Sequence, residues 1–265
     1  MSRVLIVGAS SGIGLALARS YVTDGYEVLN VSRRDCPDER VWNYRADVSV
    51  AEQRKGAVAY LKAHDMEPDV FVYSAGASMS APVEFTQEEH IRYLWEVNYF
   101  AFVEMVKELL PGLRARRGQI AAISSMAAVA PIPFDAHYSA SKAAIDAFLS
   151  VLDQEVAPYG VHVCAVMPGG TCTGFSFKRL VYDEAHCGPY YPEAQKATFT
   201  LGKMEQTGMS ADKCAALIRR HLDKRSDLLY PVGFGNGATY CLNKLLPQGI
   251  QQATIRNLYA TDKAD

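Results

Sequence analysis

The sequence predicts an α/β protein with a doubly wound parallel sheet and helices on both faces of that sheet. Short β-branched runs alternate with longer helical stretches along most of the 265 residues, which is the pattern of a parallel sheet covered by helices. Hydrophobic residues make up 49% and charged residues 21%, as in an ordinary globular protein. No repeat, low-complexity tract or linker divides the chain, so we expect residues 1–265 to form a single domain.

The expected elements alternate in chain order. The first strand is the apolar run 4–7, which leads into glycines, and the first helix, 14–24, closes at Gly25. A long helical pattern over 88–116 is interrupted near Pro111. The other strands are expected at 27–31, 41–45, 69–73, 119–123, 161–166 and 228–232. The other helices are expected at 51–63, at the alanine-rich segment 138–157, at 211–224 and over most of the tail 234–265.

Composition excludes several classes of partner. The formal charge of −2 gives no reason to expect nucleic acid or an anionic membrane as a partner. Six dispersed cysteines without a C-x-x-C pair favour free thiols in a reducing compartment over a disulfide scaffold or a zinc site. No apolar stretch is long enough to span a bilayer. We therefore expect a cytoplasmic protein without a metal site.

A glycine-rich turn lies between the first expected strand and the first helix. A bound pyrophosphate needs close approach of the backbone and N–H donors at the start of a helix, where the helix dipole favours negative charge. Glycines permit the tight turn and the close approach, and serines can donate hydrogen bonds. The turn therefore predicts a dinucleotide site formed by Gly8, Ser10, Ser11, Gly12, Ile13 and Gly14.

The end of the second strand indicates which dinucleotide binds. An acidic residue there accepts hydrogen bonds from the ribose 2′-hydroxyl of NAD and repels the 2′-phosphate of NADP. This chain has Ser32, Arg33 and Arg34, with no acid before Asp35. Arginine can pair with a phosphate through charge-assisted hydrogen bonds. We expect NADP(H), with Arg33 and either Ser10 or Ser32 at the 2′-phosphate.

Tyr138 and Lys142 are four residues apart on an expected helix. Their side chains therefore lie roughly 40° apart around the helix axis and share one face. A phenol titrates near pH ~10, and a nearby ammonium should lower the pKa of Tyr138 by stabilising the phenolate. Beside a substrate oxygen, Tyr138 could then act as the general acid or base, while Lys142 could also hydrogen-bond the cofactor's ribose.

Two further polar residues accompany this pair. Ser125 follows the strand 119–123, and its hydroxyl can bond a substrate oxygen and stabilise developing charge; Ser124 is the rival for this role. Asn98 falls in the middle of an expected helix, where asparagine is a poor helix former. A buried asparagine there suggests a kink or a water held for proton transfer.

Together these motifs resemble the short-chain dehydrogenase/reductase family, from residue 4 to about residue 175. The turn at Gly8 matches the family's glycine fingerprint, although Val7 stands where the family usually has threonine. The resemblance implies a Rossmann-type fold and a catalytic tetrad of Asn98, Ser125, Tyr138 and Lys142. It assigns further cofactor contacts to Asp47, Val48, Ser74, Ala75, Gly76, Pro168, Gly169, Thr171 and Thr173, with Ser74 in place of the family's usual asparagine. It also implies a homodimer or homotetramer, packed through the long helices around Asn98 and Tyr138.

The substrate side is less defined by sequence. Residues 170–208 break the helical pattern, and a connection of this length is usually a lid or a binding element. Its aromatic residues could wall an apolar pocket or could pack on the lid itself; they are Phe175, Phe177, Tyr182, Tyr190, Tyr191 and Phe199. The tail could cover the pocket, contact another subunit or touch a membrane surface.

The sequence thus predicts an NADPH-dependent oxidoreductase that interconverts a ketone or aldehyde with an alcohol, on an apolar substrate. The alternative is a cofactor-sensing protein that kept the fold and lost the chemistry. The presence of Asn98, Ser125, Tyr138 and Lys142 favours the enzyme. Substrate identity, physiological direction and stereochemistry stay open.

Overall fold

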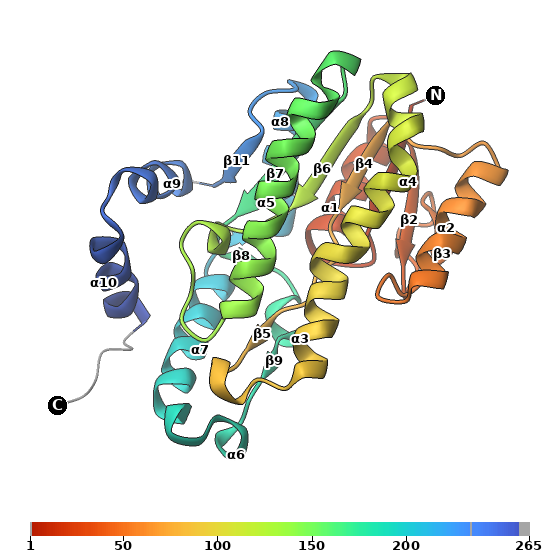
Figure 1. The fold of residues 1–265 in the computed structure, drawn as a ribbon. Helices are drawn as coiled ribbons and strands as arrows, with labels where there is room; N and C mark the ends of the chain where they lie inside the picture. The colour runs from red at the N-terminus through yellow and green to blue at the C-terminus, as the bar shows by residue number, and fades with distance from the viewer. Residues whose placement is uncertain (1, 234, 260–265) are drawn as a thin grey trace.

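Seven parallel strands form the central sheet of the computed structural model, which describes residues 2–233 and 235–259 (Figure 1). Their spatial order is β11-β7-β6-β4-β1-β2-β3. The strands are β1 (Arg3–Val7), β2 (Glu27–Ser32), β3 (Trp42–Arg45), β4 (Val70–Tyr73), β6 (Gln119–Ile123), β7 (His162–Pro168) and β11 (Leu229–Val232). The chain reverses its winding direction between β1 and β4, and ligands of such sheets bind at the carboxyl ends of the strands near this point. The predicted fold class is confirmed.

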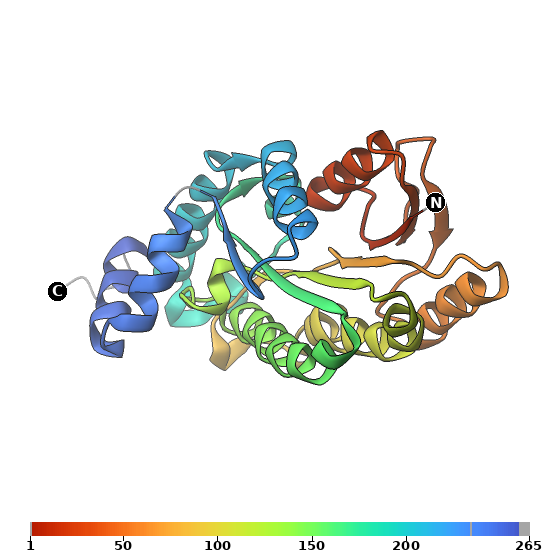
Figure 2. The same ribbon diagram turned by 90° about the horizontal axis from the view of Figure 1, so that it is seen from above.

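Alternation along the strands creates two hydrophobic layers. In β1, Leu5 and Val7 belong to one core cluster, whereas Val4 and Ile6 belong to the other, and all four side chains are fully buried. Helices α2 (Ala51–Ala63), α4 (Ala101–Arg116) and α5 (Ala136–Val156) cover the first face. Helices α1 (Gly12–Thr23) and α8 (Ala211–Asp223) cover the second, as Figure 2 shows from above.

The expected long helix 88–116 contains one irregularity, and it is not at Pro111. It consists of α3 (Glu88–Trp95), a π-helical turn over Glu96–Phe100, and α4. The expected interruption near Pro111 is wrong: α4 continues through it, with Pro111 and Lys107 exposed, where solvent can hydrate the carbonyl that proline leaves unpaired. The π turn carries Asn98 instead.

The segment expected to be irregular, 170–208, is mostly ordered. It holds β8 (Thr171–Cys172), β9 (Leu180–Val181), α6 (Glu184–Cys187) and α7 (Tyr191–Gln206). The expectation was wrong for α7 because its buried stripe consists of Ala194, Ala197 and Leu201, which gives a weak apolar signal. Two short parallel pairs fix the segment: β8 with β10 (Met209–Ser210) and β9 with β5 (Met79–Ser80).

The tail forms α9 (Asn236–Leu245) and α10 (Gln248–Tyr259), at one side of the sheet in Figure 1. Residue 234 and residues 260–265 of the expected helical tail lie outside the described residues. Helix α10 packs on α7, where Tyr259 joins Ala197 and Leu201 in a small apolar cluster. Within 2–233 and 235–259, no helix has the length and hydropathy that crossing a membrane requires.

Candidate active site

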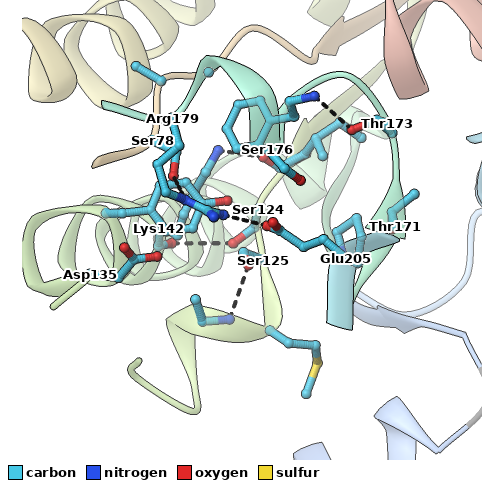
Figure 3. Close-up of a pocket in the computed structure, with 18 of the residues that line it drawn as sticks. Ser78, Ser124, Ser125, Asp135, Lys142, Thr171, Thr173, Ser176, Arg179 and Glu205 are labelled. Atoms are coloured by element: carbon cyan, nitrogen blue, oxygen red, sulfur yellow. Dashed lines mark hydrogen bonds and ion pairs between the residues drawn. The ribbon is translucent and has the colours of Figure 1, made fainter. Parts of the chain in front are cut away.

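A cavity of about 910 Å³ opens at the carboxyl ends of the strands. It is lined by the glycine-rich turn, the ends of β2, β4 and β6, the start of α5, the segment 168–180, α7 and the tail. Every site residue predicted from sequence lines this cavity except Gly14 and Asn98, which lie behind its wall. One cavity therefore joins the predicted cofactor turn to the predicted catalytic residues. Figure 3 shows part of its lining, with Ser125 and Lys142 labelled.

The glycine-rich turn depends on the absence of side chains at two positions. Gly8 has a φ of +96°, and a Cβ there would lie 2.8 Å from the backbone nitrogen of Ala75. A Cβ on Gly14 would lie 2.3 Å from the carbonyl oxygen of Gly8. The backbone thus folds closely on itself at the start of α1, which Ser11 precedes as the N-cap residue. This leaves the helix N-terminus facing the cavity, as a pyrophosphate site requires.

Asn30 stabilises this turn and was missed in the sequence analysis. Its Oδ1 accepts a hydrogen bond from the backbone nitrogen of Ala9 at 3.0 Å. Its Nδ2 donates to Arg34 O at 3.2 Å and to Asn43 Oδ1 at 2.9 Å. A buried polar residue inside an apolar strand is the signal that could have identified it. Asn30 thereby links the glycine-rich turn to the Ser32–Arg34 segment.

The end of the cavity beside β2, where the sequence predicts the adenine ribose, is positively charged. Arg33 and Arg34 line it together with Lys178, which comes from the segment after β8 and was also missed. Lys178 Nζ lies 3.4 Å from Ser11 Oγ, and burial and the charges of Arg34 and Arg33 lower the pKa of Lys178. Arg33 also lies 3.9 Å from Asp47 Oδ2, but its side chain is 65% exposed. Three cations thus converge where the sequence predicts a 2′-phosphate.

Asn98 makes hydrogen bonds that hold one part of the cavity wall in place. Its Oδ1 accepts a hydrogen bond from Ala77 N at 2.8 Å, and its Nδ2 donates to Ala77 O and to Ser141 Oγ, both at 3.0 Å. Asn98 is fully buried in the π turn. It therefore holds the loop after β4, whose Ser74, Ala75 and Gly76 line the cavity, against α5. This is the irregularity that its position in a helix suggested.

Tyr138 lies at the start of α5 with its ring partly exposed toward the cavity. Burial raises the pKa of Tyr138 to about 12, against the lowering effect of a hydrogen bond with Ser125. Ser124 instead directs its hydroxyl to the carbonyl oxygen of Lys142 at 3.4 Å. The geometry therefore favours Ser125 over Ser124 as the partner of the phenol.

Lys142 follows Tyr138 by one turn but does not lower its pKa. Lys142 Nζ donates to Ile123 O at 2.8 Å and lies 5.7 Å from the centre of the Tyr138 ring. Burial lowers the pKa of Lys142 to about 8. The expectation that Lys142 depresses the pKa of Tyr138 is wrong for this structure, because the ammonium is held by the strand and desolvation of the phenol dominates.

The loop after β7 meets the glycine-rich turn. Pro168, Gly169, Thr171 and Thr173 line the cavity, and a Cβ on Gly12 would lie 3.5 Å from the Cβ of Thr173. Thr171 Oγ1 donates to Gly169 O at 3.1 Å, and Thr173 Oγ1 accepts from Phe175 N at 3.2 Å. The loop after β7 thus lies against the glycine-rich turn.

The aromatic residues of 170–208 do not form the expected pocket wall. Only Phe175 lines the cavity, with its ring centre 6.3 Å from that of Tyr138. Phe177 and Phe199 are 80% and 73% exposed, and Tyr182 is buried in a separate cluster with residues such as Met79 and Leu94. The apolar wall comes instead from the tail, through Leu242, Leu246, Ile255, Leu258 and Tyr259. The sequence left open whether the tail covers the pocket, contacts another subunit or touches a membrane surface. The structure favours the first of these roles, because the tail lines the cavity.

A charged cluster beside Tyr138 was missed in the sequence analysis. Asp135, Arg179 and Glu205 come from the start of α5, the segment before β9 and the end of α7 (Figure 3). Arg179 pairs with Glu205 at 2.5 Å and donates to Ser78 Oγ at 3.0 Å. Burial raises the pKa of Asp135 to about 7. Asp135 and Glu205 lie 70 positions apart in sequence, with Arg179 between them, so no local pattern could reveal the cluster.

These features fit a bound nicotinamide dinucleotide. The glycine-rich turn is a cradle that a Cβ would fill, a helix N-terminus faces it, and three cations lie at its far end. No group of three or more metal-ligating side chains occurs in the described part of the chain.

Comparison with known proteins gives consistent matches. A model of the family named short chain dehydrogenase matches residues 2–180. The chain is 30% identical to the 3-ketodihydrosphingosine reductase of Bacteroides thetaiotaomicron, covering 97% of each protein. It is 29% identical to the NADPH-dependent 1-acyldihydroxyacetone phosphate reductase of Saccharomyces cerevisiae, covering 84% of this chain and 79% of that protein. A short-chain dehydrogenase crystal structure from Streptomyces avermitilis superposes with a TM-score of 0.82, at 28% identity and 99% coverage of both chains.

Proposed function

Because this chain belongs to the short-chain dehydrogenase/reductase family and is an oxidoreductase, we propose that it is an NADPH-dependent reductase of an apolar ketone or aldehyde. The observation that carries this proposal is the position of Tyr138. Its phenol hydrogen-bonds with Ser125 inside a cavity that has a dinucleotide cradle at one end and an apolar wall at the other.

In the proposed reaction Tyr138 is the general acid. With a pKa near 12 the phenol is protonated at neutral pH, so it is ready to give its proton to a carbonyl oxygen. Bound NADPH would supply the hydride for the carbonyl carbon, and the product is the alcohol. The Ser125 hydroxyl would stabilise the phenolate left behind, which solvent then reprotonates, while Lys142 would hydrogen-bond the cofactor's ribose. A protonated phenol suits reduction better than oxidation.

The choice of NADPH rests on Arg33, Arg34 and Lys178. Their mutual repulsion is relieved when a phosphate dianion lies among them. No acidic side chain replaces Ser32 at the end of β2 to accept bonds from a 2′-hydroxyl. One relative named above is itself described as NADPH-dependent.

The apolar substrate is supported by the tail. Leu246, Ile255 and Leu258 give the cavity an apolar end. The two relatives are named as reductases of 3-ketodihydrosphingosine and of 1-acyldihydroxyacetone phosphate. We also propose that 170–208 acts as the substrate lid. A cytoplasmic homodimer or homotetramer, packed through the helices that carry Asn98 and Tyr138, completes the proposal. Exposed Phe100 and Val151 on these helices suit such an interface.

The test compares wild type with Tyr138→Phe on a panel of aliphatic ketones, following nicotinamide absorbance with NADPH and NADH. We expect kcat to fall by roughly 10²–10⁴-fold, because general acid catalysis is lost, while NADPH affinity stays unchanged. Tyr190→Phe, an exposed lid tyrosine, is the matched control and should keep full activity. Equal turnover by wild type and Tyr138→Phe would remove the proposed mechanism.

A further inference from the structure

The cavity wall beside Tyr138 holds two acidic side chains and one basic side chain. Arg179 has its partners within the protein: Glu205 Oε1 at 2.5 Å and Ser78 Oγ at 3.0 Å. The Arg179 and Glu205 side chains are only 3% and 15% exposed. In Figure 3 dashed lines join Arg179 to Ser78 and Glu205, with Asp135 labelled at the start of α5. The guanidinium is thus already paired.

The carboxyl oxygens of this cluster are not all paired. Asp135 is 1% exposed, and neither of its oxygens has a hydrogen-bond partner among the described residues; nor does Glu205 Oε2. Asp135 occupies the N-cap position of α5, yet its side chain does not cap the helix. Buried acceptors without donors are destabilising and uncommon in proteins. Three acceptor oxygens in the wall of one cavity therefore indicate a ligand that donates hydrogen bonds.

The net charge of this cluster restricts the chemical class of ligand that can bind there. Asp135 and Glu205 carry two potential negative charges against the single positive charge of Arg179. A phosphate or carboxylate in this position would face two carboxylates, with the one guanidinium already bound to Glu205. A protonated amine would instead balance the cluster and donate up to three hydrogen bonds.

The cluster lies next to the reacting position. Asp135 and Tyr138 are three residues apart at the start of α5 and so lie on the same side of the helix. The charges of Asp135, Glu205 and Arg179 all act on the Tyr138 phenol. A substrate whose carbonyl oxygen contacts Tyr138 therefore brings its neighbouring carbon close to Asp135.

The remaining surface of the cavity is apolar. Leu246, Ile255 and Leu258 of the tail line it, and the charges of Asp135 and Glu205 also act on Tyr259 at the end of α10. The polar cluster thus lies between the reacting position and the apolar wall of the tail. A substrate that fits has a polar end near Tyr138 and a hydrocarbon chain toward α10.

We propose that Asp135 and Glu205 bind a protonated amine on the carbon beside the carbonyl of a long-chain ketone. This inference rests on the proposed reductase function and adds a substrate class to it. Asp135 is the specificity-determining residue, and Arg179 positions Glu205 through their ion pair.

The test measures binding, so that it does not depend on turnover. A long-chain 2-amino alcohol is titrated into the full-length protein loaded with NADP⁺, beside three analogues of equal chain length: the 1,2-diol, the unsubstituted alcohol and the phosphate ester of that alcohol. We expect the amine to bind at least ~10-fold more tightly than the unsubstituted alcohol, as a charge-assisted bond to a buried carboxylate provides. The phosphate ester should bind most weakly.

Asp135→Asn should remove most of the preference for the amine and leave the unsubstituted alcohol within about twofold of wild type. Glu184→Gln, which removes an exposed carboxylate from the lid that carries Glu205, is the control and should keep the preference. If Asp135→Asn does not fold, the affinities of the wild-type protein for the amine and its three analogues are sufficient to test the proposal. Equal binding of the amine and the unsubstituted alcohol, or tighter binding of the diol than of the amine, overturns the proposal.

The reductase function is judged separately by turnover of the unsubstituted ketone. Turnover without an amine preference would leave the reductase and refute the amine site. An amine preference in binding, without reduction of any ketone, would support the amine site and refute the reductase.

Discussion

The cofactor end and the substrate end of the cavity are built in different ways. The cofactor end consists of short segments that each follow a strand of the sheet, at 8–14, 32–34 and 74–76, and its shape is a property of the backbone. The substrate end consists of side chains from α5, from the segment 170–208 with its helix α7, and from α10. The comparison shows that a backbone-built site can be recognised in a sequence, whereas a site built from distant side chains requires the fold.

The two ends also differ in how their polar groups are satisfied. At the cofactor end, Asn30 makes hydrogen bonds to Ala9, Arg34 and Asn43. At the substrate end, the carboxyl group of Asp135 has no hydrogen-bond partner among the described residues. A satisfied network makes a turn rigid, whereas unpaired groups reduce stability and are retained where a ligand uses them.

Gly14→Ala tests the backbone-built end and should have the largest effect. The new Cβ would lie 2.3 Å from Gly8 O and 2.9 Å from Gly8 C, and neither backbone atom can move without opening the turn. We expect NADPH affinity to fall by at least ~100-fold, about 2.7 kcal/mol or more, as measured by fluorescence titration. Thermal unfolding shows whether the fold is lost as well.

Gly202→Ala is the matched control for this change. Gly202 lies inside α7, a Cβ there meets nothing within 4 Å, and alanine is the better helix former. This variant should bind NADPH normally and be slightly more stable than wild type. If Gly14→Ala bound NADPH as tightly as wild type, the contact between Gly14 and the Gly8 backbone could not determine the shape of the cofactor turn.

Asp135→Asn tests the substrate end through stability. The pKa of Asp135 in the folded protein is raised from 3.8 to about 7 by burial, so the fold favours the protonated carboxyl. Stability from this group is therefore present at low pH and is lost as pH rises from about 4 to about 7. Asparagine avoids this loss, so the variant should be more stable than wild type by about 1 to 3 kcal/mol near pH ~8, with little gain near pH ~4.

The charged and titratable groups around Asp135 come from four elements. Arg179 belongs to the segment before β9, Glu205 to α7, Tyr138 to α5 and Tyr259 to α10. Arg179 opposes the upward shift and Glu205 adds to it. Denaturant unfolding of both proteins across this pH range measures the difference. Destabilisation by asparagine at every pH would mean that Asp135 is a structural residue after all.

The same contrast explains what the sequence predicts well and what it does not. The seven strands and the Gly8–Gly14 turn follow from apolar runs and glycines that are adjacent in sequence. Tyr138 and Lys142 share a helix face by their spacing alone. The raised pKa of Tyr138 could not be foreseen, because it depends on burial by segments that pack from elsewhere.

The misjudged elements have related causes. Helix α7 was missed because its buried stripe is mostly alanine, and its burial comes from α10 and from the cluster around Met79 and Leu94 rather than from the central sheet. The aromatic residues of the lid suggested a pocket wall, yet five of the six do not line the cavity. Aromatic composition reports that a segment packs against something, but only the fold shows which surface it meets.

Lys178 is an exception to the division between the two ends of the cavity, because it belongs to the lid but lies at the cofactor end. Lys178→Ala removes one of three cations that face the predicted 2′-phosphate, so NADPH affinity should fall by about 10-fold and NADH affinity should stay within about twofold. Lys203→Ala, which removes an exposed lysine of α7, is the control for lost charge alone. Arg33→Ala should act in the same direction, and its effect should not add fully to that of Lys178→Ala, since both contact one phosphate. Equal losses for NADPH and NADH would assign Lys178 to lid closure, and the separation of the two ends would then hold without exception.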